Sequence, residues 1–188
     1  MKATLQLPEK YEEIACIDLE KNKKQMIVVN VLSIVLAVLV FLPMLILAPE
    51  GASFPSEVLD LVILLAGMFG YIILHEAVHG VCFWGFSRQK PRFGWKSVYA
   101  YAASDAYYGK APYLVIGLAP VVLWGVVLVV LALVLPIRWY WLVQMIQLIN
   151  LSGAAGDLYV TWHLSRMPKD ILIQDAGVAM QIFAPAGK

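Results

Sequence analysis

Long uninterrupted runs of hydrophobic residues dominate the chain. Four such runs, separated by short polar segments, cover about residues 26–48, 58–86, 113–135 and 139–165. A run of about 20 apolar residues is long enough to cross the hydrocarbon core of a bilayer as a helix. The pattern therefore predicts a transmembrane domain of four helices over residues 26–165.

The polar segments predict smaller elements. Residues 1–25 are expected to form a cytosolic N-terminal segment, and residues 166–188 a cytosolic C-terminal tail with a hairpin around Asp175-Ala176-Gly177. Residues 97–110 alternate aromatic and small side chains about Ser104-Asp105. This segment predicts either a short hairpin or an interfacial stretch at the level of the lipid headgroups. The expected fold class is an all-α polytopic membrane protein with short cytosolic β-hairpin elements.

Composition and charge agree with a membrane protein. Hydrophobic residues make up 61% of the 188 residues, and the formal net charge is only +1, so neither a nucleic-acid partner nor an ordinary globular domain is expected. Every Lys and Arg except Arg138 falls on one side of the predicted topology. The positive-inside rule makes this side cytosolic and predicts a multi-pass protein with both termini in the cytosol.

The second run contains His75-Glu76-Ala77-Val78-His79, three ionisable side chains in an otherwise apolar segment. Residues four positions apart on a helix lie on the same face, so both imidazoles can bind one metal ion. In zinc hydrolases with this spacing, the glutamate is a general base that takes a proton from water activated by the metal. The motif predicts His75 and His79 as zinc ligands and Glu76 as the catalytic residue.

Chance is the alternative explanation, with both histidines hydrogen-bonded inside a packed helix. The predicted membrane setting argues against chance, because a charged side chain at the centre of a transmembrane helix costs about 2.5 to 3.5 kcal/mol on insertion scales. Ionisable residues within a membrane span are therefore candidates for function. The membrane setting favours a metal site.

A catalytic zinc site usually has three protein ligands and one open position, so the two histidines need a partner. Asp157 is the clearest ionisable residue well inside another predicted span. The two histidines and Asp157 lie about equally far along their helices from the predicted outer ends at Val58 and Trp139. This match in depth predicts Asp157 as the third ligand.

The surroundings of Asp157 suggest a further site residue. Asn150, Gly153, Ala154 and Asp157 recur at i, i+3, i+4 and i+7, which on a continuous helix forms one small, polar stripe suited to close helix packing. Asn150 is expected to bind a substrate carbonyl or stabilise an oxyanion. The alternative is an interhelical hydrogen bond, which fits the sequence equally well.

Two other potential ligands are set aside. Cys82 shares the face of the histidines, but residues seven apart on a helix are separated by about 10.5 Å, so a buried, unreactive thiol is expected. His163 points about 240° away from Asp157 around the helix, which favours an interfacial histidine. Cys16 and Cys82 are the only cysteines, and no disulfide is expected between them.

These motifs resemble the site-2 protease class of intramembrane zinc metalloproteases, and more closely the small prokaryotic membrane proteins known as putative zincin peptidases. The resemblance lies in HEAVHG at 75–80, Ala119-Pro120, and SGAAGDLY at 152–159. It implies a three-helix metalloprotease core in a prokaryotic cell membrane, with zinc bound by His75, His79 and Asp157. The chain departs from site-2 proteases because no Pro lies between Asn150 and Asp157, and Leu158 stands where a Gly is typical.

The predicted function is an intramembrane zinc metalloprotease that cleaves membrane-embedded protein or peptide substrates with metal-activated water. Gly80, Gly85 and the aromatic segment are the places where an extended substrate is expected. One alternative is a non-proteolytic membrane protein that binds a metal or haem. The other is an inactive protease homologue that binds membrane segments.

Overall fold

The computed structural model describes residues 3–96, 99–177 and 179–187. The chain forms two compact units. Unit 1 comprises Met1–Val28, Glu76–Pro120 and Asp157–Lys188, and unit 2 comprises Val29–His75 and Val121–Gly156. The boundaries cut through helices, so each unit contains parts of several long elements.

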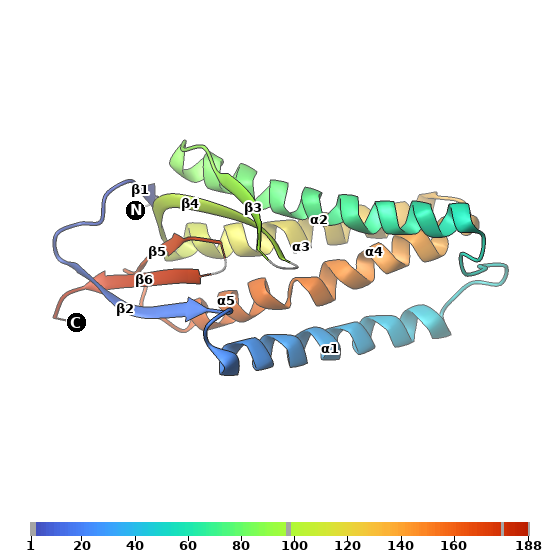
Figure 1. Cartoon of the computed structure of the whole chain (residues 1–188), viewed down its shortest axis with the longest axis horizontal. Coiled ribbons are helices and arrows are strands. Elements are labelled where there is room, and N and C mark those ends of the chain that lie inside the picture. Colours follow the sequence, from blue (N-terminus) through green and yellow to red (C-terminus); the bar gives the residue numbers. More distant parts are fainter. Residues whose placement is uncertain (1–2, 97–98, 178, 188) are drawn as a thin grey trace. The chain divides into compact units, whose positions relative to one another are not determined.

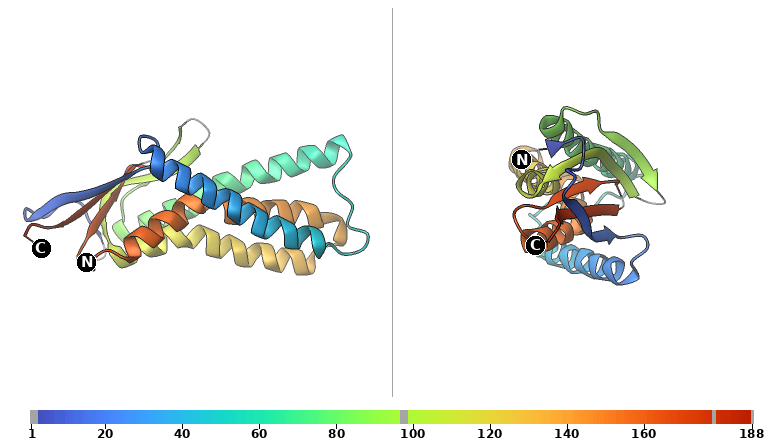
Figure 2. Two further views of the ribbon diagram at one scale, coloured as in Figure 1. Left: turned by 90° about the horizontal axis from the view of Figure 1, so that it is seen from below. Right: turned by 90° about the vertical axis from the view of Figure 1, so that its left-hand side faces the viewer.

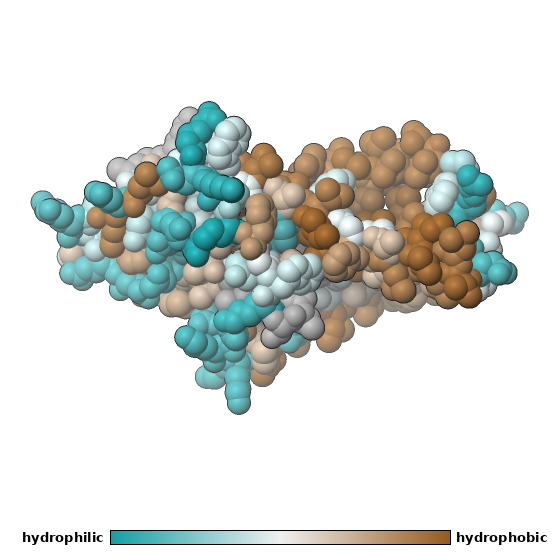
Figure 3. All heavy atoms as spheres, turned by 45° about the horizontal axis from the view of Figure 1, so that its top comes forward, coloured by the Kyte–Doolittle hydropathy of each residue, from teal (hydrophilic) through white to brown (hydrophobic). Residues whose placement is uncertain are grey.

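Three helices match the first three hydrophobic runs: α1 (Lys23–Ile46), α2 (Val58–Ser87) and α3 (Lys110–Val134). Each is long and apolar enough to cross a membrane, judged by length and composition. Many of their large hydrophobic side chains are exposed, as lipid-facing side chains are, and hydrophobic residues cover much of the unit 2 helices on the face shown in Figure 3. The prediction of apolar helices of spanning length holds for these three runs.

The fourth run is not one continuous helix. A short 3₁₀ helix, η1 (Ile137–Trp139), is followed by α4 (Tyr140–Gly153) and α5 (Ala155–Ser165). Ala154 separates α4 from α5 with φ −76° and ψ 10°, outside helical geometry. Just before the break, the Ser152 hydroxyl donates to the Leu148 carbonyl, a bond that commonly bends helices. The expected continuous stripe from Asn150 to Asp157 is therefore interrupted.

The strands of unit 1 form an antiparallel sheet in the order β1-β4-β5-β6-β2, with β3 paired to β4 outside this path (Figure 1). The strands are β1 (Ala3–Thr4), β2 (Tyr11–Asp18), β3 (Arg92–Lys96), β4 (Tyr99–Gly109), β5 (Leu172–Asp175) and β6 (Ala179–Pro185). Figure 2 shows β2 beside β6 in both views. The predicted fold class is therefore correct only in its helical part, since the chain also contains this sheet, which joins segments from both ends of the chain and is larger than the expected short hairpins.

The N-terminal segment differs most from the expectation, because it contains β1 and β2. Its sequence YEEIACID gives little local signal for a strand, and the burial of β2 alternates only weakly. It pairs along its length with β6 near the other end of the chain. Pairing between distant segments supplies the hydrogen bonds and cross-strand packing that local propensity does not indicate.

Of the two predicted hairpins, the one in the tail is confirmed. Strands β5 and β6 pair from Asp175↔Met180 onwards, and Gly177 adopts φ +98° at the turn, a conformation that favours glycine. The turn predicted at Ser104-Asp105 is wrong, because both residues lie within β4, at the start of a register shift. β4 instead pairs with β3, and residues 97 and 98, where the predicted segment begins, lie outside the described residues.

The core of unit 1 lies between the sheet and the helix segments of the same unit. Tyr108 of β4 and Phe83 of α2 are nearly fully buried, with ring centroids 5.3 Å apart. The Tyr108 hydroxyl lies 2.6 Å from Ser104 Oγ and 3.1 Å from Ser87 Oγ. This network ties the C-terminal turn of α2 to β4 and holds the helix segment that carries Glu76 and His79 against the sheet.

Candidate metal centre

Helix α2 carries the three residues of the HExxH motif. His75 and His79 are buried, one turn apart, and Glu76 is half-buried. The boundary between the two units falls between His75 and Glu76, but α2 runs unbroken across it. The helix itself therefore fixes His75 relative to Glu76 and His79.

His79 is oriented by the backbone of α3. Its Nδ1 lies 3.0 Å from the carbonyl oxygen of Ile116, and because a carbonyl only accepts, Nδ1 carries the hydrogen. The other ring nitrogen, Nε2, lies 3.6 Å from Oδ1 of Asp157. A backbone carbonyl that takes one N–H of a histidine is the usual partner of a metal-binding imidazole.

Asp157 lies in the first turn of α5. The backbone N–H groups at the start of a helix favour a negative charge there, so this position suits a carboxylate. Asp157 is only partly buried, with 26% of its side chain exposed. Its carboxylate therefore faces His79 without being sealed in the core.

Potential ligand atoms of His75, His79 and Asp157 lie within 4.8 Å of one another. Two imidazole nitrogens and one carboxylate oxygen are a donor set of the kind that catalytic zinc sites use, with a further position left for water or substrate. The hydrogen bond from His79 Nδ1 leaves the lone pair of Nε2, on the side that faces Asp157, available to bind a metal ion. The residues present thus fit a zinc ion, and their roles as ligands stay a prediction.

A family model described as "Putative zincin peptidase" matches residues 68–172, more than half of the chain. The chain belongs to this family. The match includes the HExxH motif and Asp157. No curated protein and no solved structure matches the chain.

The family of putative zincin peptidases is one of metallopeptidases, in agreement with the donor set. Membership supports a zinc-dependent peptidase and confirms this part of the resemblance seen in the sequence. The likeness to site-2 proteases, and with it cleavage inside the membrane, stays a prediction.

Asn150 is fully buried within unit 2. Its Oδ1 accepts a hydrogen bond of 2.7 Å from the Tyr71 hydroxyl, and its Nδ2 donates to the Val121 carbonyl at 3.3 Å. These partners lie on α2 and α3, as the alternative of an interhelical hydrogen bond requires. Binding of substrate by Asn150 stays a prediction. Gly153 of the same stripe is exposed, and a Cβ there would meet nothing within 4 Å.

The residues set aside earlier lie outside the cluster of potential ligands. Cys82 is half-buried and Cys16 is exposed, and both are free thiols. The ring of His163 stacks on Tyr159 one turn earlier on α5, with centroids 6.3 Å apart. Neither Cys82 nor His163 belongs to the group formed by His75, His79 and Asp157.

A buried carboxyl group that the sequence did not indicate lies on β5. Asp175 accepts hydrogen bonds from the Tyr113 hydroxyl and from the backbone N–H of Gly177. Burial raises the pKa of Asp175 to about 6, while these two hydrogen bonds and the nearby His79 lower it and Asp157 raises it. Asp175 appeared in a polar turn sequence, so only the packing of the sheet reveals its burial.

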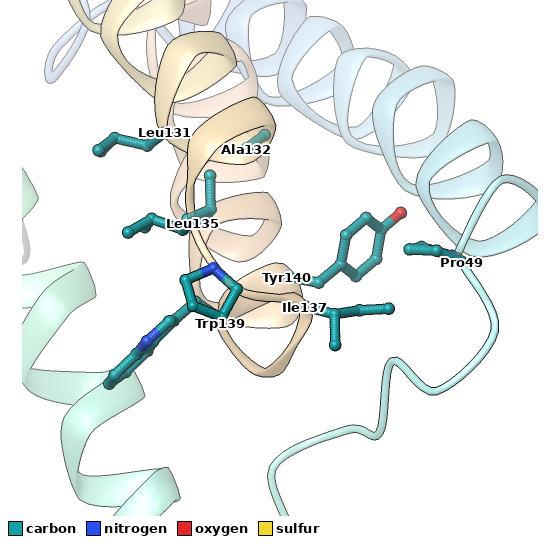
Figure 4. A pocket seen from close by; sticks show the side chains of 9 residues that line it. Pro49, Leu131, Ala132, Leu135, Ile137, Trp139 and Tyr140 are labelled. Atoms are coloured by element: carbon teal, nitrogen blue, oxygen red, sulfur yellow. The ribbon is translucent and has the colours of Figure 1, made fainter.

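A pocket beside the connection between α3 and α4 offers no metal-binding or catalytic side chains comparable to those of the candidate metal centre (Figure 4). Its walls come from the end of α3, the start of α4 and Pro49, with Tyr140 and Ile137 extending toward Pro49. Its lining residues include no His, Cys, Asp or Glu. The pocket is apolar, and the candidate metal centre remains the site with catalytic potential.

Proposed function

We propose that this member of the putative zincin peptidase family is an intramembrane zinc metalloprotease that hydrolyses peptide bonds of membrane-embedded substrates. The observation that carries the proposal is the grouping of His75, His79 and Asp157, with two of the three on a helix apolar enough to cross a membrane. Ionisable groups in such a helix are energetically costly, and their presence there indicates a function. A metal centre gives them one.

Each residue of the site has a chemical role in this proposal. His75, His79 and Asp157 would hold the zinc ion, which when bound polarises a scissile carbonyl and lowers the pKa of water to about 7. The carboxylate of Glu76, next to His75 on α2, accepts the proton of the attacking water. It then delivers this proton to the nitrogen of the leaving amine, so that the peptide bond breaks with no net change in Glu76.

The substrate is expected to bind in an extended conformation, because the hydrogen bonds of a helix hide its carbonyl groups. Strand β3 pairs with β4 and, within the described part of the chain, with no second strand. Its Phe93 and Trp95 side chains are more than half exposed. This edge is suited to adding a substrate strand through backbone hydrogen bonds.

The glycines of α2 differ in how much room they leave. A Cβ at Gly80 would meet the Phe93 ring, with Pro91 Cγ at 3.3 Å, so this position lies under the approach to β3. A Cβ at Gly85 would meet nothing within 4 Å. Because Phe93 covers the buried Gly80 and Gly85 is exposed, Gly85 is the position of the two that leaves room for a substrate strand.

The sheet supports a topology with both termini on one side of the membrane. Strand β2 precedes α1, β3 and β4 lie between α2 and α3, and β5 and β6 follow α5, yet all belong to one sheet. If α1, α2 and α3 each cross the bilayer, the chain must cross once more before β5 to rejoin this sheet. The segment of α4 and α5 is thus proposed as the return span, and the Lys and Arg distribution places the sheet in the cytosol.

The Glu76→Gln variant tests the proposed function. It keeps the size of the side chain and removes its basicity, so purified protein should bind zinc like the wild type while cleavage of a reporter with one transmembrane segment falls about 100-fold or more. The matched control is Glu57→Gln, an exposed residue just before α2, which should cleave at the wild-type rate. Wild-type cleavage by Glu76→Gln would exclude the proposed mechanism.

A further inference from the structure

A chain of hydrogen bonds inside unit 2 leads from His75 to the backbone of α3. The Tyr71 hydroxyl lies 2.9 Å from Nδ1 of His75 and 2.7 Å from Oδ1 of Asn150. Asn150 Nδ2 then lies 3.3 Å from the carbonyl oxygen of Val121. Three helices, α2, α4 and α3, contribute to this chain.

The direction of every bond in the chain follows from its last member. The Val121 carbonyl only accepts, so the nitrogen of the Asn150 amide must face it and Oδ1 must face Tyr71. Oδ1 accepts, so the single hydroxyl proton of Tyr71 goes to Asn150. The Tyr71 oxygen is then an acceptor toward His75, and Nδ1 of His75 must supply the hydrogen.

Burial makes this arrangement hard to reverse. Tyr71 is 6% exposed, His75 9% and Asn150 0%. The Tyr71 ring also packs edge-on against Trp124, with centroids 6.2 Å apart, which limits its movement. The opposite tautomer of His75 would leave two acceptors face to face among buried side chains.

We propose that Tyr71 and Asn150 are positioning residues that hold His75 in the Nδ1–H tautomer and so leave Nε2 to bind the metal. The proposal rests on the metal site of the proposed function, but not on peptide cleavage. It gives the two histidines the same tautomer by different means, since His79 obtains it from a backbone carbonyl. It also assigns Asn150 a role that needs no contact with substrate.

Nitrogen NMR of ¹⁵N-histidine-labelled protein in detergent, without metal and at a pH where the imidazoles are neutral, tests the tautomer directly. The chain has only 3 histidines, and His79 is an internal reference because its Nδ1 faces a carbonyl. The expected wild-type result is a proton on Nδ1 of His75. A proton on Nε2 instead would overturn the proposal, whether or not any variant folds.

Metal affinity provides the second readout. Tyr71→Phe removes the hydroxyl and should weaken zinc binding about 10- to 100-fold, the usual effect of losing a residue that orients a ligand. Its spectrum should show a mixture of His75 tautomers. The matched control is Tyr140→Phe, which loses a hydrogen bond from Tyr140 to the Met44 carbonyl in the same unit and should bind zinc like the wild type.

Asn150 variants separate positioning from packing. Asn150→Leu removes the acceptor for Tyr71 and should reproduce the spectrum of Tyr71→Phe, whereas Asn150→Asp keeps an acceptor and should keep the wild-type tautomer. Wild-type zinc affinity and tautomer in both Tyr71→Phe and Asn150→Leu would overturn the proposal. Failure of the proposed function has a different signature, because a wild-type protein without peptidase activity would still show the Nδ1–H tautomer of His75.

Discussion

Nε2 of His79 faces Oδ1 of Asp157 at 3.6 Å, while Nδ1 of the same ring is held by the Ile116 carbonyl. With its Nδ1 hydrogen committed, a neutral His79 presents a lone pair to a carboxylate. Two electron-rich atoms at this distance repel one another unless a positive charge lies near both, either a proton on Nε2 or a bound cation. The pair is therefore suited to an ion pair in the metal-free protein and to a cation when one is bound, and its two members come from helices far apart in the sequence.

Removal of Asp157 is expected to weaken this site severely. Asp157→Ala deletes one of three predicted ligands, so zinc affinity measured by competition with a chelator should fall at least about 100-fold, the upper end of what residues beyond the ligands contribute. Asp60→Ala, an exposed carboxylate in the first turn of α2, is the control and should bind zinc normally. Unchanged affinity in Asp157→Ala would remove Asp157 from the ligand set.

Asp175 gives the protein a predictable pH dependence. Its folded-state pKa of about 6 lies above the value of about 3.9 for an unfolded aspartate, so between these values the folded protein binds more protons. The free energy of unfolding should therefore be highest below about pH 4, as far as this group is concerned, and fall as pH rises to about 6. The expected loss is on the order of 3 kcal/mol.

Denaturation of metal-free protein at several pH values measures this contribution. Asp175→Asn should flatten the decline between about pH 4 and 6, whereas Asp105→Asn, whose side chain is 78% exposed in the same sheet, should not. His79 lowers the pKa of Asp175 and Asp157 raises it. Zinc bound near these two residues adds positive charge, so it should move the decline in the free energy of unfolding to lower pH. An identical slope in Asp175→Asn and the wild type would contradict this account.

The sequence was sufficient to predict the features that depend on local patterns. Hydrophobic runs determine α1, α2 and α3, and the four-residue spacing in HEAVH determines the shared face of His75 and His79. The depth argument also brought Asp157 to the histidines, because rise per residue and span limits are properties of helices in a bilayer. Asp157 lies near the two histidines despite the break at Ala154. The continuous helical stripe from Asn150 to Asp157, which was assumed with the depth argument, is not present.

The features that the sequence missed depend on contacts between distant segments. Strand β2 contains exposed acidic residues and pairs with β6, a relation that no local pattern indicates. Tyr71 lies one turn before His75 on α2, so helical spacing identifies it as a neighbour. Its hydrogen-bond partner Asn150 lies on α4, and that contact comes from the packing of helices.

Gly177 is expected to be intolerant of a side chain. Its φ of +98° disfavours any L residue by about 1 to 2 kcal/mol, and a Cβ would also contact the Tyr101 ring, with Cγ at 2.8 Å. Gly187→Ala is the matched control, because φ there is +85° but nothing lies within 4 Å. Thermal unfolding should show that Gly177→Ala lowers the free energy of unfolding by about 1 to 3 kcal/mol more than Gly187→Ala does, because only the first variant crowds a neighbouring side chain. Equal losses would mean that the Tyr101 ring moves aside freely.

Cysteine labelling tests the proposed topology, and the chain offers a natural probe. Cys16 of β2 is exposed. Partial desolvation and the carboxylates of Glu13 and Asp18 raise the pKa of its thiol, so labelling needs mildly alkaline buffer. A membrane-impermeant maleimide should label Cys16 only after the cell membrane is opened.

In a Cys16→Ser background, Ser53→Cys, in the exposed loop between α1 and α2, should be labelled in intact cells. The Cys16→Ser protein alone controls for reaction at the half-buried Cys82. The reverse pattern would place the sheet outside, and labelling of both positions from one side would show that α1 does not cross the membrane.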